Sequence, residues 1–213
     1  MPKAGINYGP RIKAPDYPKI AKDAEREVLQ ELGIHRPEDL ITKQPDDLIV
    51  KAAQILKQAD ATLGAYIDER DQALAHLWFY EQRLGLAKTV GLTNTSYRYA
   101  LARAMFGDKM HPLPETDSNA DLVRIAEENG IRRVDDAEAQ LLEKAHIVYW
   151  ARARRDVAVR YMQEAVLALS EAPYEWSPER IAEHAGVERE LIYKQRTAAR
   201  KRHGLYIPRS ASA

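Results

Sequence analysis

Residues 177–200 read SPERIAEHAGVERELIYKQRTAAR, and this stretch decides the fold that we expect. It begins with Ser177, Pro178 and Glu179, which is the pattern of a helix start, because a serine hydroxyl caps free backbone N–H groups and proline fits the first turn. Gly186 stands where a helix-ending turn needs a positive φ, which glycine adopts at little steric cost. The stretch therefore predicts two helices joined by a tight glycine turn.

The spacing of small and apolar residues in this stretch occurs a second time in the chain. The pattern is an apolar residue followed by a small one, then a turn glycine with an apolar neighbour, then an apolar residue on the next helix. The later copy has Ile181, Ala182, Gly186, Val187 and Ile192, and the earlier copy has Leu86, Ala87, Gly91, Leu92 and Tyr97. The small residue lets the two helices cross closely. We therefore expect two such helix pairs.

A long amphipathic segment without an internal proline precedes each helix pair, at residues 45–80 and 135–170. Apolar residues recur in both at spacings of about three and four, which indicates a long helix with one buried face. A short helix ending in a glycine turn precedes each long segment, at Gly33 and at Gly130. This repeated order of elements predicts a tandem duplication.

The two long segments also share an Arg-Asp-x-Ala motif, at residues 70–73 and 155–158. Their apolar stripes predict ordinary core packing. The alternative is the seam of a homodimer formed through the long helices, although Arg70 falls on the best heptad seam of the first segment.

We expect an all-α protein with two tandem lobes, each made of a short helix, a long amphipathic helix and a glycine-turn helix pair. The expected boundaries are a flexible basic arm at 1–19, a first lobe at 20–106, a linker at 107–119, a second lobe at 120–205 and a flexible tail at 206–213. The linker contains two prolines among polar residues, which is typical of a loop. The alternative for the arm is insertion into the minor groove of DNA.

The composition excludes several classes of protein. The chain has no cysteine, so disulfides and cysteine-based zinc sites are excluded and a cytoplasmic location is expected. It has no apolar stretch long enough for a membrane span. The six histidines lack metal-ligand spacing, and neither a glycine-rich phosphate loop nor a nucleophile elbow is present. We therefore expect no cofactor, no metal and no enzymatic activity.

The formal net charge is zero, with 32 basic and 32 acidic side chains, so any attraction to nucleic acid must come from local patches. Basic residues gather in the N-terminal arm (Lys3, Arg11, Lys13 and Lys19), in one long segment (Arg152, Arg154, Arg155 and Arg160) and near the C-terminus (Arg196, Arg200, Lys201, Arg202 and His203). These clusters are the candidate patches for steering DNA.

The two helix pairs resemble the helix-turn-helix DNA-binding superfamily, in the short form found in bacterial and phage regulators. The resemblance covers Pro178–Arg200 and, with a looser match, Gln82–Met105. Two positions depart from the superfamily pattern. Gln195 stands where an apolar residue is usual, and Tyr97 is bulkier than the usual residue at its position.

The resemblance implies that the second helix of each pair enters the major groove of DNA. The residues it places toward DNA in the first pair are Thr93, Asn94, Thr95, Arg98 and Tyr99. In the second pair they are Arg189, Tyr193, Lys194 and Thr197, with Arg200 and Arg202 toward phosphates. Asparagine pairs with adenine and arginine with guanine through two hydrogen bonds, which is how such helices discriminate bases.

The expected function is sequence-specific binding of double-stranded DNA by a cytoplasmic, nucleoid-associated transcriptional regulator of a bacterium or a mobile element. The alternative is a helical assembly protein of the phage DNA-packaging type, in which the long helices form a ring or bundle. A protein-binding adaptor is a third possibility, and it predicts no salt-dependent affinity for DNA.

Overall fold

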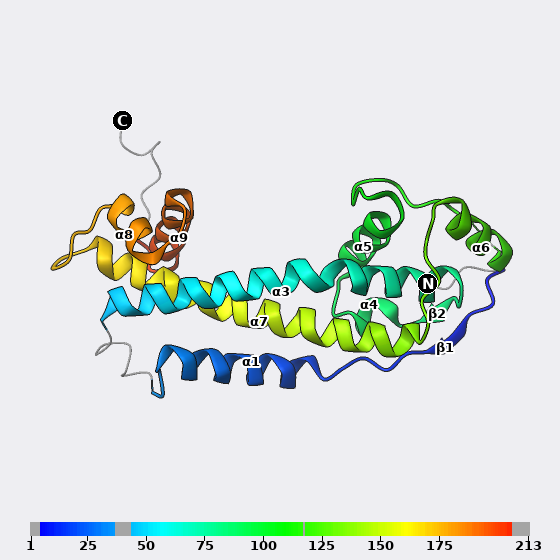
Figure 1. The fold of residues 1–213 in the computed structure, drawn as a ribbon, viewed down its shortest axis with the longest axis horizontal. Coiled ribbons are helices and arrows are strands. Elements are labelled where there is room, and N and C mark those ends of the chain that lie inside the picture. The colour runs from blue at the N-terminus through cyan, green and yellow to red at the C-terminus, as the bar shows by residue number, and fades with distance from the viewer. Residues whose placement is uncertain (1–4, 37–43, 117, 206–213) are drawn as a thin grey trace. The chain divides into compact units, whose positions relative to one another are not determined.

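The computed structural model describes residues 5–36, 44–116 and 118–205, and the regular secondary structure of these residues is almost entirely helical (Figure 1). The two long helices are α3 (Pro45–Phe79) and α7 (Ala137–Ser170), within two residues of the segments 45–80 and 135–170 expected from the sequence. The all-α fold is therefore confirmed.

Shorter elements complete the described part of the chain. They are β1 (Gly9–Arg11), α1 (Tyr17–Leu32), β2 (Arg83–Leu84), α4 (Leu86–Thr89), α5 (Asn94–Phe106), α6 (Asn119–Glu128), α8 (Pro178–Ala185) and α9 (Arg189–Arg202). The two strands pair in parallel. The expected tail at 206–213 lies outside the described residues.

The short helices α1 and α6 end in the glycine turns that the sequence predicts. Gly33 has a φ of 71° and Gly130 a φ of 70°, and each is followed by a buried isoleucine. The Ile34 N–H donates to the Leu29 carbonyl at 2.8 Å, and the N–H of Ile131 reaches back to its own helix in the same way at 2.9 Å. This hydrogen bond characterises a helix that ends with a left-handed glycine.

The chain divides into two compact units that are discontinuous in sequence. Unit 1 comprises Met1–Ile20 and Ala61–Ala151, and unit 2 comprises Ala21–Asp60 and Arg152–Ala213. Each unit therefore combines the short helix of one half of the sequence with the helix pair of the other half. These boundaries differ from the continuous lobes 20–106 and 120–205 expected above, because each long helix contributes one of its halves to each unit.

The core of unit 1 joins the C-terminal half of α3 to the N-terminal half of α7. Its fully buried residues include Leu74, Leu77, Leu101 and Leu141. The N-terminal segment belongs to the same core, because Ile6 and Ile12 are buried in it and β1 pairs with β2. In its described part, this segment is packed into the core of unit 1 and is not the free arm that the sequence suggests.

The core of unit 2 joins the N-terminal half of α3 to the C-terminal half of α7. Ile49, Met162, Leu169, Ile181 and Ile192 are fully buried there. The apolar stripes of the long helices therefore serve the cores of the two units, as the sequence predicts for ordinary core packing.

Candidate nucleic-acid interface

In unit 1 the first helix pair is formed by α4, a glycine turn and α5. Gly91 has a φ of 62°, and the Leu92 N–H donates to the Ala87 carbonyl at 2.9 Å. The Thr93 hydroxyl accepts a hydrogen bond from the Ser96 N–H at 3.2 Å and so caps the start of α5. Thr93, expected to face DNA, therefore has a capping role in the helix itself.

In unit 2 the second pair, α8 and α9, has the same turn. Gly186 has a φ of 63°, and the Val187 N–H donates to the Ala182 carbonyl at 3.0 Å. The Ser177 hydroxyl caps α8 by accepting from the Arg180 N–H at 3.3 Å. The cap, the first-turn proline and the glycine turn read from the sequence are all present.

The polar residue Gln195 occupies a buried position without losing its hydrogen bonding. Its side chain is 9% exposed and accepts a hydrogen bond at 2.8 Å from the side-chain amide of Gln163 on α7. A buried amide with a partner costs far less than an unpaired one. The departure from the superfamily pattern is thus accommodated by a second polar residue more than thirty positions earlier.

Tyr97 fills its bulky position by packing with other aromatic rings. Its ring meets the edge of Trp78 at a centroid distance of 6.4 Å, and Trp78 lies 6.4 Å from Tyr8. Burial raises the pKa of the Tyr97 hydroxyl far above its usual range. Tyr97 is therefore a neutral packing residue that holds α5 against the end of α3, where Trp78 lies.

An ion-pair cluster fixes the inner face of α5 to α3. The buried Asp71 carboxylate accepts hydrogen bonds from Arg70 Nε at 2.9 Å and Nη2 at 2.6 Å, and its second oxygen pairs with Arg103 of α5. The Gln72 side chain also donates to the Ala104 carbonyl at 3.2 Å. With its inner face held in this way, α5 presents a rigid outer face.

The outer face of α5 carries the other residues that the sequence placed toward DNA. Asn94, Thr95, Arg98 and Tyr99 are all exposed. Thr95, Arg98 and Tyr99 line one hollow of about 240 Å³. Within the ranges that the structure describes, Arg98 forms no ion pair.

The exposed face of α9 carries fewer available cations. Tyr193, Lys194 and Thr197 are exposed and line one shallow hollow. Other predicted contacts are engaged within unit 2: Arg189 lies 3.5 Å from Glu179, Arg200 3.7 Å from Glu171 and Arg202 2.9 Å from Glu164. All three are partly exposed ion pairs, which compete only weakly with a phosphate, and the shortest of them joins Arg202 of α9 to α7.

Three of the four arginines in the basic cluster of the second long segment pair with acidic residues inside unit 2. Arg154 is 5% exposed and donates to both carboxylate oxygens of Glu31, at 2.7 and 3.0 Å. Arg155 lies 2.7 Å from Asp60, and Arg160 pairs with a glutamate of α1 at 3.6 Å. This cluster therefore has less unpaired positive charge than the sequence predicts, because α1 and α3 bring acidic residues to it from distant parts of the chain.

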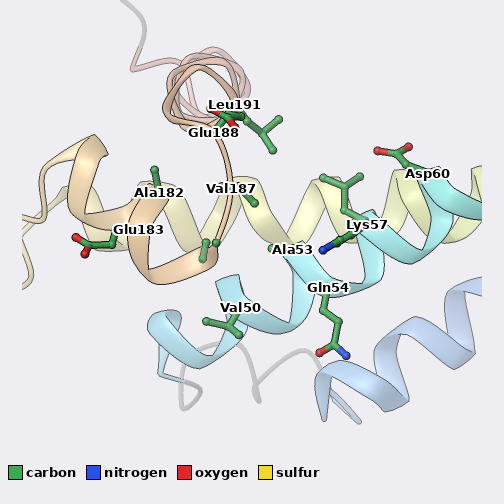
Figure 2. A pocket seen from close by; sticks show the side chains of 13 residues that line it. Val50, Ala53, Gln54, Lys57, Asp60, Ala182, Glu183, Val187, Glu188 and Leu191 are labelled. Carbon is green, nitrogen blue, oxygen red and sulfur yellow. The ribbon is translucent and has the colours of Figure 1, made fainter.

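An open hollow lies in unit 2, between α3 and the turn from α8 to α9 (Figure 2). It has a volume of about 780 Å³, an apolar floor and a charged rim. The lining residues include Ala53, Leu56, Ala182, Val187 and Leu191, with Lys57, Asp60, Glu183 and Glu188 at the rim. Successive positions on a helix turn by about 100°, so the side of α9 with Leu191 faces away from the side with Tyr193.

Comparison with known protein families, with curated proteins and with solved structures gave no match to this chain. Across the described ranges, no three metal-binding side chains are grouped so as to hold an ion. None of the helices in those ranges combines the length and the apolar character needed to cross a membrane.

Two basic residues that lie near α5 in the chain are not among the contacts predicted from the sequence. Lys88 on α4 and Lys109 just after α5 are exposed, and neither forms an ion pair in the part of the chain that the structure describes. Lys109 falls in the segment assigned to a linker. The sequence signal for Lys109 was Gly107, a residue type that commonly ends helices. In the structure Gly107 ends α5 with a φ of 69° and turns the following residues back.

Proposed function

We propose that this protein binds double-stranded DNA in a sequence-specific manner, with α5 as its principal reading helix. The observation that carries the proposal is the outer face of α5, where Asn94, Thr95 and Arg98 are exposed together while Asp71 holds the opposite face. Residues four apart share one face of a helix, so Asn94 and Arg98 project from the same side.

The chemistry of this face suits the major groove. An asparagine recognises adenine and an arginine recognises guanine through two hydrogen bonds each, and each such pair discriminates by about 1–3 kcal/mol. Arg98 is not engaged by a carboxylate of the described residues, so contact with a base requires no internal ion pair to break. The exposed Lys88, on α4, and Lys109, just after α5, add positive charge for phosphates.

The helix α9 has a secondary role in this proposal. Its exposed Tyr193, Lys194 and Thr197 contact DNA, while Glu188 and Glu190 beside its start repel phosphates. With one helix pair in each unit, a single chain addresses two sites on DNA. This suits a transcriptional regulator of a bacterium or a mobile element, acting in the cytoplasm on the nucleoid.

The test is selection of bound sites from random duplexes, followed by affinity measurements on the selected duplex. Arg98→Ala should weaken binding by about 5- to 150-fold, the equivalent of about 1–3 kcal/mol, and relax preference at one base pair. Arg132→Ala is the matched control, since Arg132 is an exposed arginine of the same unit outside the helix pair. Equal effects of the two substitutions would refute the assignment of α5. A wild-type chain with no affinity for duplex at low ionic strength would refute the function.

The second candidate is a helical assembly protein of the phage DNA-packaging type, and the groove of unit 2 favours it. An apolar groove with a charged rim is the kind of surface on which an amphipathic helix docks. For this candidate the occupant is a helix of a second copy of the chain. Mass measurement in solution separates the candidates, because a monomer or dimer fits the regulator and a ring-sized oligomer fits the assembly protein.

A further inference from the structure

The hollow beside α5 is closed on one side by the residues that follow this helix. Gly107 turns the chain back at the end of α5, and the Asp108 carboxylate accepts a hydrogen bond from the Met110 N–H at 2.9 Å. As a result, Lys109, Met110 and His111 line the same hollow as Thr95, Arg98 and Tyr99. This segment therefore forms a wall of the hollow, with a defined local structure.

The imidazole of His111 is held in place by two contacts. Its ring packs at a tilt against Phe106 at a centroid distance of 3.9 Å, and its Nδ1 lies 3.0 Å from the Pro112 carbonyl oxygen. A carbonyl oxygen only accepts hydrogen bonds, so Nδ1 carries the hydrogen in this contact. The second ring nitrogen, Nε2, is then a hydrogen-bond acceptor, so His111 shapes the wall of the hollow and is not a donor to an anion.

The charges that line the hollow have one sign. Arg98 and Lys109 are cationic, the lining contains no carboxylate, and neither cation has an ion-pair partner within residues 5–36, 44–116 and 118–205. Like charges brought together in a concave site favour an anion with several acceptor oxygens, which guanidinium, ammonium and hydroxyl groups bind together. Thr95 supplies such a hydroxyl in the same lining.

We propose that this hollow, which we call the α5 pocket, binds a phosphate group through Lys109 and the Thr95 hydroxyl, with the positive charge of Arg98 beside them. The phosphate comes either from the backbone of the duplex that α5 reads or from a free nucleotide. A volume of about 240 Å³ leaves space for a sugar beside the phosphate, against Tyr99 and Met110. The duplex source rests on the proposed function, whereas the free nucleotide does not.

The experiment compares the wild-type protein with Lys109→Ala, with Arg132→Ala as the matched control. For the duplex source, Lys109→Ala should weaken binding by a similar factor on every duplex sequence and lower the slope of log affinity against log salt by about 1. The base preference measured by site selection should stay unchanged, because a phosphate contact carries no sequence information.

Titration with inorganic phosphate and with adenosine monophosphate, followed by calorimetry, tests the free source. Saturable binding that is lost in Lys109→Ala and kept in Arg132→Ala would support it, even if duplex affinity is absent and the proposed function fails. The pocket is refuted if Lys109→Ala matches Arg132→Ala in duplex affinity, salt slope and phosphate binding. In that case a surviving effect of Arg98→Ala on base preference would leave the proposed function standing.

Discussion

Replacing Asp71 by alanine removes the only carboxylate that the structure places within ion-pair distance of the buried Arg70 guanidinium in the described part of unit 1. Arg70 and Asp71 are each 1% exposed, and two hydrogen bonds of 2.9 and 2.6 Å join them. Removing one partner of a buried ion pair costs about 3–5 kcal/mol, because the remaining charge stays buried without compensation. The lost contact to Arg103, whose side chain is 37% exposed, adds at most about 1 kcal/mol after screening by solvent.

This loss corresponds to a change of about two to three and a half orders of magnitude in the unfolding equilibrium. It is a large share of the roughly 5–15 kcal/mol by which domains are stable. Guanidinium chloride unfolding, followed by far-ultraviolet circular dichroism, measures it from the shift in midpoint and the slope.

The matched control is Asp156→Ala, which changes the same position of the second Arg-Asp-x-Ala motif. Asp156 is exposed and makes no ion pair within the described residues, so this change should stay within about 0.5 kcal/mol of wild type. A double variant, Arg70→Met with Asp71→Ala, should recover much of the loss by removing the orphaned charge. The reasoning is refuted if Asp71→Ala lies within about 1 kcal/mol of Asp156→Ala.

Three further predictions follow from the same structure. Gly91→Ala and Gly186→Ala should each lower the free energy of unfolding by about 1–2 kcal/mol, because alanine is strained at a positive φ. Gly91→Ala should cost more, since its new Cβ would lie 3.1 Å from the Tyr17 ring, whereas nothing lies within 4 Å of a Cβ at Gly186. Equal unfolding midpoints of the two variants in denaturant would contradict this prediction. Gln195→Leu should destabilise by about 1–3 kcal/mol because it leaves the Gln163 amide buried without its acceptor, and adding Gln163→Met should restore part of that loss in the same assay. Burial raises the pKa of Tyr17 to about 12 from its usual 10.0, so the folded state is favoured below pH 10 and loses this contribution as the pH rises toward 12. The ultraviolet titration of wild type minus that of Tyr17→Phe should therefore have its midpoint near 12, and a midpoint near 10 would disprove this prediction.

The predictable part of the candidate site is its local framework. Ser177, Pro178 and Gly186 fix the limits of α8 through contacts with residues at most five positions away. The exposure of Asn94 and Arg98 follows from helical spacing once α5 is placed. The sequence did not predict which charged side chains form ion pairs and which do not. Arg202 pairs with Glu164 on another helix, and this contact has no local signature in the sequence.

The duplicated motifs illustrate the same limit of sequence patterns. Arg70 and Asp71 form a buried ion pair with each other, and Asp71 also pairs with α5. In the second motif, Arg155 pairs with Asp60, and Asp156 is exposed. Identical letters therefore have different roles in the two halves. Burial is a property of the surrounding elements, and the surroundings of these two motifs differ.

The amino-acid sequence by itself determined where helices begin and end, because caps, prolines, glycine turns and apolar spacing act within a few residues along the chain. Only the tertiary structure decided that α6 joins α4 and α5 in unit 1 while α1 joins α8 and α9 in unit 2. It also decided that Arg154 meets Glu31, more than a hundred residues away. The apolar stripe of a long helix shows that this face must be buried, but many apolar stripes of similar width could pack against it. The choice of partner helix therefore depends on side-chain packing and on charges that meet only in the folded chain.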